Sequence, residues 1–489
     1  MSWKETAEPV LTRMPSVRRP EGHVPFKRKL GWTAGVLVLY FFLTNIFLYG
    51  ADTGADAFGQ FRSILAGGQG TVLQLGIGPI VTASIVLQLL GGADLLGLDT
   101  DDPRDQVLYQ GLQKLLVVVM VCLTGLPMVF AGSFLPASES LARTFPGGEL
   151  GVKWLIFAQI FVGGILILFM DEIVSKWGVG SGIGLFIIAG VSQKLVGGLF
   201  AWSGLGGETG LLPTWFAILT GSAENMPSLL TPQGVQYLLI GEGDILAIVT
   251  TVLIFAIVVY AESVRVEIPL SHARVKGARG RFPVKLIYAS VLPMILVRAL
   301  QANIQFLGNI LNSQLGNDMP AWLGQYSSQG QVSGGLFYYF APIQTREQWM
   351  WWLGGTGNEP WEILLRVGID LTFMVIGGAI FAIFWVETTD MGPEATAKQI
   401  QNSGMQIPGF RQNTGVIEKV MERYIPQVTV IGGALVGLLA VAANMLGTIG
   451  DVTGTGLLLT VSITYKIYEE IAEEQLMEMH PMMREMFGG

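Results

Sequence analysis

Few residues in this 489-residue chain have the types and spacing that catalysis or metal binding requires. The dipeptide Gly-Lys does not occur in the sequence, so a phosphate-binding loop of the Walker type is excluded. The three histidines, His23, His272 and His480, lie outside the long apolar segments, and Cys122 is the single cysteine. We therefore expect no catalytic centre, no metal site, no cofactor and no intramolecular disulfide.

Ionisable side chains inside apolar segments would indicate a different chemistry, because gradient-driven transporters bind their coupling ions with such groups. Arg298 is the only charge deep in a long apolar run, while Lys194 and Asp370 lie near the ends of such runs. A secondary transporter with inverted repeats is an alternative interpretation, although no coupling carboxylate is evident. A membrane scaffold without a pore is a third one.

The composition indicates a membrane protein, since 51% of the residues are hydrophobic and only 13% are charged. An average soluble domain is nearer a quarter charged. Ten segments lack Asp, Glu, Lys and Arg, apart from Arg298 in the seventh, and they cover residues 31–50, 71–93, 115–138, 154–170, 177–193, 245–261, 286–317, 371–386, 424–450 and 452–465. Most approach the length of about 20 residues that crosses a bilayer as a helix. We predict ten transmembrane helices.

The distribution of basic residues predicts the orientation of these spans. With the N-terminus in the cytoplasm, 22 of the 29 Lys and Arg residues lie on the cytoplasmic side. Both termini are therefore expected to be cytoplasmic. Five spans per half, an odd number, put the two halves in opposite topology if they are repeats. The net charge of −8 fits either ordinary solvated loops or a host with a salty cytoplasm.

One segment does not fit the pattern of ten spans. Residues 56–70 are amphipathic, half a span long and rich in glycine at their end. They are typical of a helix that lies on the membrane surface. The alternative is a short helix that folds back into a water-filled cavity.

Three sequence motifs identify the family that the chain resembles. GIGPIVTASIVLQLL at 76–90, DEIVSKWGVGSGIGLF at 171–186 and IPGFR at 407–411 closely resemble SecY, the central subunit of the protein-conducting channel, in its archaeal branch. The resemblance includes the order and spacing of all ten spans. It implies an all-α polytopic membrane protein, with two inverted five-helix halves, a re-entrant plug helix and no enzymatic activity.

The resemblance also implies a pore whose waist is a ring of aliphatic side chains. By the matching motifs, these would be Ile77, Val81, Ile183, Ile187, Ile295 and Leu459. Without the resemblance, aliphatic pairs at a spacing of four residues would usually pack against other helices or face lipid.

The plug would be a helix at 57–66, with Ala57, Phe58, Phe61, Arg62, Ile64 and Leu65. A lateral gate would open between spans two and three on one side and spans seven and eight on the other. Candidates for its polar seam are Thr82, Ser84, Thr124 and Asn303. Ordinary helix packing by small polar residues is the alternative.

Two cytoplasmic loops resemble ribosome docking sites, because basic loops bind RNA phosphate. The basic residues are Arg265, Arg274, Lys276, Arg279 and Arg281 in the first loop and Arg411 in the second. These loops could also serve only as determinants of topology.

The expected domains are a cytoplasmic segment at 1–29, a first half at 30–207 that includes the plug, and an external linker at 208–243. A second half follows at 244–472, with cytoplasmic loops at 264–285 and 387–423, and a cytoplasmic tail covers 473–489. The expected partners are small single-span subunits (SecE-like and a beta subunit), the ribosome, unfolded polypeptides with signal segments, and the lipid of the cell membrane. The sequence leaves a homo-oligomer open.

Overall fold

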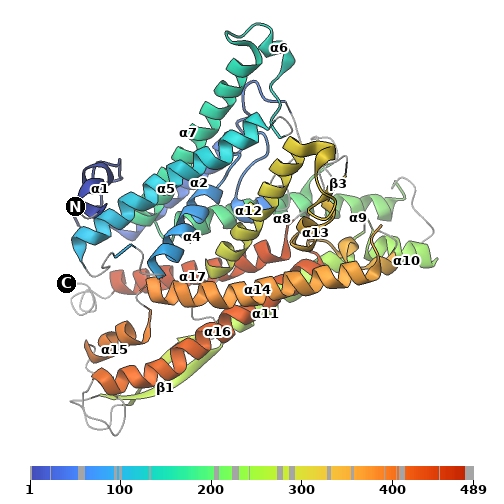
Figure 1. The fold of residues 1–489 in the computed structure, drawn as a ribbon. Helices are drawn as coiled ribbons and strands as arrows, with labels where there is room; N and C mark the ends of the chain where they lie inside the picture. Colours follow the sequence, from blue (N-terminus) through green and yellow to red (C-terminus); the bar gives the residue numbers. More distant parts are fainter. Residues whose placement is uncertain are drawn as a thin grey trace.

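Ten main helices build the described part of the molecule, and Figure 1 shows them as one bundle. The computed structural model describes residues 3–22, 24–52, 61–92, 96–97, 102–131, 134–202, 209–222, 231–241, 243–272, 279–285, 292–327, 332–353, 357–389, 391–402, 405–406, 414–450 and 452–479. The ten helices are α2 (Phe26–Leu43), α4 (Gly78–Gly92), α5 (Pro103–Phe130), α7 (Gly148–Trp177), α8 (Gly182–Phe200), α11 (Ile245–Ser263), α12 (Leu292–Leu315), α14 (Pro360–Thr388), α16 (Thr414–Leu446) and α17 (Gly454–Met479).

These helices match the predicted spans in number and order. Seven are long and apolar enough to cross a membrane by themselves, and α4 is a shorter apolar helix. The other two, α2 and α17, begin or continue in charged sequence outside the predicted runs. Five helices precede the middle of the chain and five follow it, so the two halves have opposite topology. The prediction of an all-α bundle with ten spans is confirmed.

Shorter elements connect the spans. They are α1 (Trp3–Leu11), α3 (Arg62–Leu65), α6 (Glu139–Ala142), α9 (Leu211–Thr220), α10 (Pro232–Leu239), α13 (Leu336–Tyr339), α15 (Pro393–Asn402), β1 (Arg265–His272), β2 (Arg279–Lys285), β3 (Gln325–Tyr326), β4 (Val332–Gly334) and β5 (Met405–Gln406). In Figure 1, β1 and α15 lie at the lower left, below the end of α14, while α6 and α10 lie far from them, at the top and the right. The expected external linker therefore contains two helices, α9 and α10.

Local sequence explains where the helices begin. The Asp102 side chain accepts a hydrogen bond from the backbone amide of Arg104 and caps α5, and Ser181 caps α8 in the same way through the amide of Gly184. A capping box formed by Glu359 and Glu362 starts α14, with proline as its first residue. As a result, α14 starts eleven residues before the charge-free run at 371–386.

The N-terminal segment is attached to the first half by ion pairs. Glu8 of α1 pairs with Arg104 at the start of α5, and the hydrogen bond from that guanidinium lowers the pKa of the Glu8 carboxyl. Glu172 of α7 binds both Lys114 and Lys176 at 2.8 and 2.6 Å. Lys114 and Lys176 also donate to backbone carbonyl groups of Pro15 and Val17. Much of the predicted cytoplasmic segment thus packs on the ends of α5 and α7.

One large apolar cluster forms the core, with side chains from both halves. In the second half, α14 and α16 approach closely because small residues face each other. A Cβ atom added to Gly378 would lie 2.6 Å from the carbonyl oxygen of Gly433. The outward faces carry exposed aliphatic and aromatic side chains, such as Val252 and Phe255 of α11. Such faces are typical of helices in contact with lipid.

Candidate functional site: an apolar waist with a seated plug

Four helices bring the six predicted ring residues into the large apolar cluster. Ile77 directly precedes α4 and Val81 lies in its first turn, while Ile183 and Ile187 lie at the start of α8, Ile295 in α12 and Leu459 in α17. All are buried except Ile183, which is half-buried and packs against the cluster. The Asp171 carboxylate accepts a 2.9 Å hydrogen bond from the backbone amide of Ile183 and thereby fixes the first turn of α8.

The described part of the predicted plug lies directly against this cluster. Its helix is short: α3 covers Arg62–Leu65, and the expected helix at 57–66 is described only from Phe61 onward. Ala57 and Phe58 lie outside the described residues. Phe61, Ile64 and Leu65 are buried in the large cluster, and Arg62 is also buried, with 8% of its surface exposed. The helix packs against α8, α12 and α17, three of the four helices that carry ring residues.

Two hydrogen bonds hold the C-terminal end of α3 in place. The backbone amide of Ile77 donates to the carbonyl oxygen of Leu65 at 2.7 Å. The hydroxyl of Tyr40, from α2, donates to the carbonyl oxygen of Ala66 at 3.0 Å, and both residues are buried. The plug and the ring are therefore connected through the backbone, and this connection does not depend on the side chains of the ring.

Gly76 permits this close approach. Its φ angle is +54°, and a Cβ atom added to it would lie 2.0 Å from the carbonyl oxygen of Leu65. Any side chain at this position would therefore collide with the plug as well as strain the backbone. The glycine was part of the motif at 76–90, but its steric role was not predicted.

The candidate seam residues have different partners. The amide nitrogen of Asn303, on α12, donates to the hydroxyl of Thr82, on α4, at 3.0 Å, so the structure brings these two together across the halves. The Ser84 hydroxyl donates to the carbonyl oxygen of Ile80 in its own helix and lies 3.4 Å from the Gln113 side chain of α5. Ser84 therefore contacts its own half. Thr124 is half-buried in α5, and its side chain makes no hydrogen bond to another described residue.

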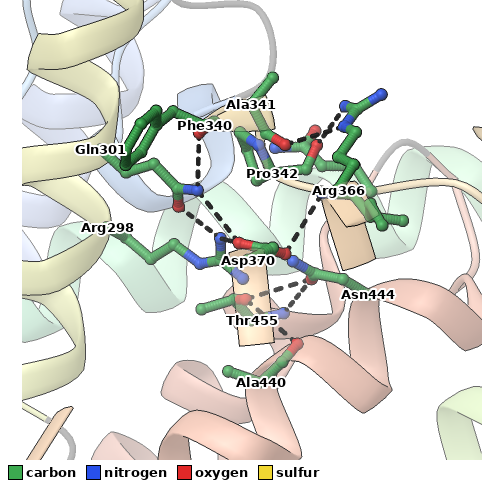
Figure 2. A network of polar contacts seen from close by, with 12 residues as sticks. Arg298, Gln301, Phe340, Ala341, Pro342, Arg366, Asp370, Ala440, Asn444 and Thr455 are labelled. Atoms are coloured by element: carbon green, nitrogen blue, oxygen red, sulfur yellow. Dashed lines mark hydrogen bonds and ion pairs between the residues drawn. The ribbon is translucent and has the colours of Figure 1, made fainter. Parts of the chain in front are cut away.

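Sequence reasoning missed a buried polar network beside the ring, which Figure 2 shows. Arg298 of α12 donates to Asp370 of α14 at 3.3 Å and to Gln301 at 2.6 Å. The expectation that Asp370 lies near the end of a span was wrong. Because α14 begins at Pro360, Asp370 lies well inside this helix, with 1% of its surface exposed. Its carboxylate already binds Arg298, Gln301 and the amide of Ile343, so it is not the free coupling group that a transporter needs.

The first expected docking loop is a β-hairpin rather than an irregular loop. Strands β1 and β2 pair antiparallel from Arg265 opposite Lys285, and β5 of the second loop pairs with the other edge of β1. The guanidinium of Arg265, one of the candidate docking residues, binds Glu469 of α17 at 3.1 Å, and Lys285 binds the same carboxylate. Arg279 and Arg281 lie on β2. Arg274, Lys276 and Arg411 lie outside the described residues.

The described residues contain no group of three His, Cys, Asp or Glu side chains that could hold a metal ion.

The comparisons with known proteins decide the family. A profile of the SecY family matches residues 71–468, and a profile described as the plug domain of Sec61p matches residues 38–70. The chain belongs to the SecY family. The protein translocase subunit SecY of Halobacterium salinarum is 76% identical over 491 residues, with 100% of both chains covered.

Solved structures agree with this assignment over nearly the whole chain. A structure described as a protein-conducting channel matches with a TM-score of 0.78 at 38% identity and covers 97% of this chain and 98% of its own. Sec61 in the canine ribosome–channel complex from the endoplasmic reticulum matches with a TM-score of 0.75 at 38% identity, with the same coverage. This SecY-family chain is thus a membrane-embedded subunit of a protein-conducting channel, and not a secondary transporter or a scaffold without a pore.

Proposed function

We propose that this channel subunit passes unfolded polypeptides through the ring of Ile77, Val81, Ile183, Ile187, Ile295 and Leu459 and releases hydrophobic segments sideways between α4 and α12. The observation that carries the proposal is the packing of the plug against the ring. The carbonyl of Leu65 accepts a hydrogen bond from the ring residue Ile77, and the plug side chains are buried in the same apolar cluster as the ring. These contacts support the proposal that the plug closes the resting channel.

The chemistry of the ring suits a seal that must also let a chain pass. An aliphatic constriction loses its water and blocks ions when it is empty. It offers a passing polypeptide no fixed polar group to which the chain could bind. Buried plug side chains add to the seal, because moving them into water has a cost that grows with the apolar area exposed.

The lateral exit is proposed at the contact between α4 and α12. The hydrogen bond from Asn303 to Thr82 joins two neutral side chains, so it contributes only about 1 kcal/mol. An arriving hydrophobic segment can offset a cost of that size by burying a few apolar groups. Ser84 and Thr124 stay candidates for the neighbouring surface of the first half.

We further propose that both termini lie in the cytoplasm and that the chain spans the cell membrane. The N-terminal α1, the hairpin of β1 and β2, and α15 then share the cytoplasmic side, which agrees with their positions in Figure 1. The hairpin would dock the ribosome through Arg279 and Arg281 and through the basic residues Arg274, Lys276 and Arg411, whereas Arg265 anchors its base. SecE-like and beta subunits are proposed as partners, and a homo-oligomer is left open. The relative from a halophilic archaeon supports a salty cytoplasm as the reason for the acidic charge balance.

Ion conductance of the reconstituted channel tests the ring and the plug. Ile187→Asn and Leu459→Asn should each raise the resting leak, because a polar side chain hydrates the waist. Deletion of 57–66 should act in the same direction. The matched control is Val196→Asn, at a site on α8 that is 57% exposed on the outer surface. Ile188, also on α8, is unsuitable as a control because it is half-buried and packs against the core. If the leak is unchanged in both ring variants while the bundle is correctly inserted, the assignment of these residues to the waist of the pore is refuted.

A further inference from the structure

The external segment between α12 and α14 descends into the bundle, where its backbone is held by side chains of both helices. Gln305 and Gln301 of α12 donate to the carbonyl oxygens of Phe337 and Phe340 at 2.9 and 3.0 Å. Such irregular backbone is tolerated at membrane depth only when its polar groups are satisfied by protein.

From the other side, α14 binds the next residues of the same segment. Arg366 donates to the carbonyl oxygens of Ala341 and Pro342 at 3.0 and 2.9 Å, and its guanidinium lies over the ring of Tyr338. The carboxylate of Asp370 accepts a hydrogen bond from the amide of Ile343. Residues 336–343, which we call the strap, are thus bound by α12 and α14 together, as Figure 2 shows.

Arg298 and Asp370 join the two helices directly beneath the strap. The side chains are 1% and 0% exposed, and Arg298 is the largest fully buried side chain in the described part of the molecule. Two of its guanidinium nitrogens, Nε and Nη2, have no hydrogen-bond partner among the described residues. A buried ion pair that is incompletely satisfied adds little to stability compared with apolar side chains of the same size. Stability alone therefore does not explain why α12 carries a charge three residues after the ring residue Ile295.

The outer surface between α12 and α14 offers less to hold the helices together. An apolar cavity of about 710 Å³ lies there, lined by side chains that include Val297, Leu300, Phe373 and Ile376. Helix α4 packs against both α12 and α14, and among the described residues its side-chain hydrogen bond to α12 is the neutral one between Asn303 and Thr82. The inner polar contacts with α14 and the strap are the stronger and more numerous of these connections.

We propose that Arg298 and Asp370 are positioning residues that join α12, α14 and the strap into one rigid unit. The gate then opens where α12 meets α4, while α12 and α14 move together. The inference rests on the lateral release proposed above and adds to it the residues that determine which helix contact breaks. It also gives Arg298, the one charge deep in an apolar run, a role that needs no direct contact with the passing chain.

The test uses disulfide cross-linking in the full-length chain, assembled with its partner subunits, with Cys122→Ala as the background. Val297→Cys with Gly377→Cys reports on the contact between α12 and α14, because a Cβ atom on Gly377 would lie 3.8 Å from the Cβ atom of Val297, a distance that a disulfide can span. Thr82→Cys with Asn303→Cys reports on the contact between α4 and α12. Oxidation rates are compared in the resting channel and in a channel that holds a stalled hydrophobic segment.

Two charge variants are combined with these reporters. Arg298→Met with Asp370→Leu removes both charges at similar volume, so that no buried charge is left unpaired. Arg298→Asp with Asp370→Arg reverses the pair and should restore the connection. Loss of a mere packing contact would not be restored by reversing the charges.

With the native charge pair, the stalled segment should slow oxidation between α4 and α12 severalfold, because it separates the two helices, and it should leave oxidation between α12 and α14 unchanged. In Arg298→Met with Asp370→Leu, the segment should slow both reactions, and the reversed pair should restore the native pattern. Unchanged oxidation between α12 and α14 in the uncharged variant would overturn this inference alone. If the segment does not affect the contact of α4 with α12 even with the native pair, the lateral release is refuted, and this inference with it.

Discussion

The backbone amide of Ile77 donates a 2.7 Å hydrogen bond to the carbonyl oxygen of Leu65, so the first ring residue is bonded to the last residue of the plug helix. Because both groups belong to the main chain, substitutions of ring side chains leave this bond in place. Mutations in the ring should therefore raise the resting leak by hydrating the waist, whereas mutations around the plug should raise it by displacing the plug.

Tyr40→Phe should loosen the plug. The substitution removes the hydroxyl that donates to the carbonyl of Ala66 and leaves that buried carbonyl without this donor, at a cost of about 1–3 kcal/mol. Resting conductance should rise roughly tenfold or more, since 1.4 kcal/mol corresponds to a factor of ten in an equilibrium. Tyr49→Phe, at a site that is 65% exposed, is the control. Equal conductance in both variants would contradict the proposed anchoring.

Gly76→Ala should displace the plug even more. The new Cβ atom would lie 2.0 Å from the carbonyl oxygen of Leu65, and the backbone at φ +54° disfavours alanine by about 1–2 kcal/mol even without this clash. We expect a higher leak together with a lower unfolding temperature. Gly91→Ala near the end of α4, where a Cβ atom meets no other group within 4 Å, should change neither quantity. An unchanged leak in Gly76→Ala would contradict the prediction, because it would show that the plug still closes the channel despite the added Cβ atom.

Asn303→Leu with Thr82→Val should lower the hydrophobicity that a segment needs for release into lipid. Removing both partners at once avoids an unpaired buried amide and leaves mainly the loss of one hydrogen bond, about 1 kcal/mol, in favour of opening. The measurement is the membrane insertion of test segments of graded hydrophobicity. Ser84→Ala is the control, because the hydrogen bonds described for Ser84 stay within its own half. If the double variant and the control require the same hydrophobicity of a segment for its insertion, the bond between Asn303 and Thr82 does not hold the gate shut.

Arg279→Glu with Arg281→Glu, or Arg411→Glu, should weaken ribosome binding without unfolding the bundle, because charge reversal repels RNA phosphate. Binding of the unaltered channel should also fall as salt is raised. Glu469→Gln should weaken binding less, since it loosens only the base of the hairpin through partly exposed ion pairs worth about 0.2–1 kcal/mol each. Arg143→Glu, at the residue that follows α6 and lies far from the hairpin, is the control. Native affinity in all the loop variants would leave these loops with a role in topology only.

Labelling tests the orientation. In the Cys122→Ala background, Arg279→Cys should react with an impermeant thiol reagent only from the cytoplasmic side, and Glu347→Cys only from outside. Arg279 lies on β2, and Glu347 lies between α13 and α14. The reverse pattern would invert the proposed topology.

Much of the fold could be predicted from the sequence, because charge-free runs of about 20 residues have few alternatives in a bilayer. The hairpin was missed, although Val266, Ile268 and Leu270 alternate with other residues in the pattern of a strand. Asp370 was misplaced because a charge-free run was taken as the whole helix, whereas α14 begins at Pro360 and buries Arg366 and Asp370 on its inner face.

The candidate site could be predicted only in part. The spacing of Ile77 and Val81 indicates one helix face, but not whether that face lines a pore or packs, and the family resemblance supplied the choice. The bonds from Tyr40 to Ala66 and from Arg298 to Asp370 join residues far apart in the chain. Periodicity reports on single elements, so it contains no signal for such contacts.

The charge pair of α12 and α14 has a consequence for how this protein is itself inserted into a membrane. The α12 helix is the least apolar of the seven helices that are long and apolar enough to span, and a lone arginine near the middle of a bilayer is costly. Asp370 arrives only after the strap has been synthesised. We therefore expect α12 to remain next to the channel that inserts this protein until α14 has been synthesised. The two helices then enter the lipid together, with their charges paired.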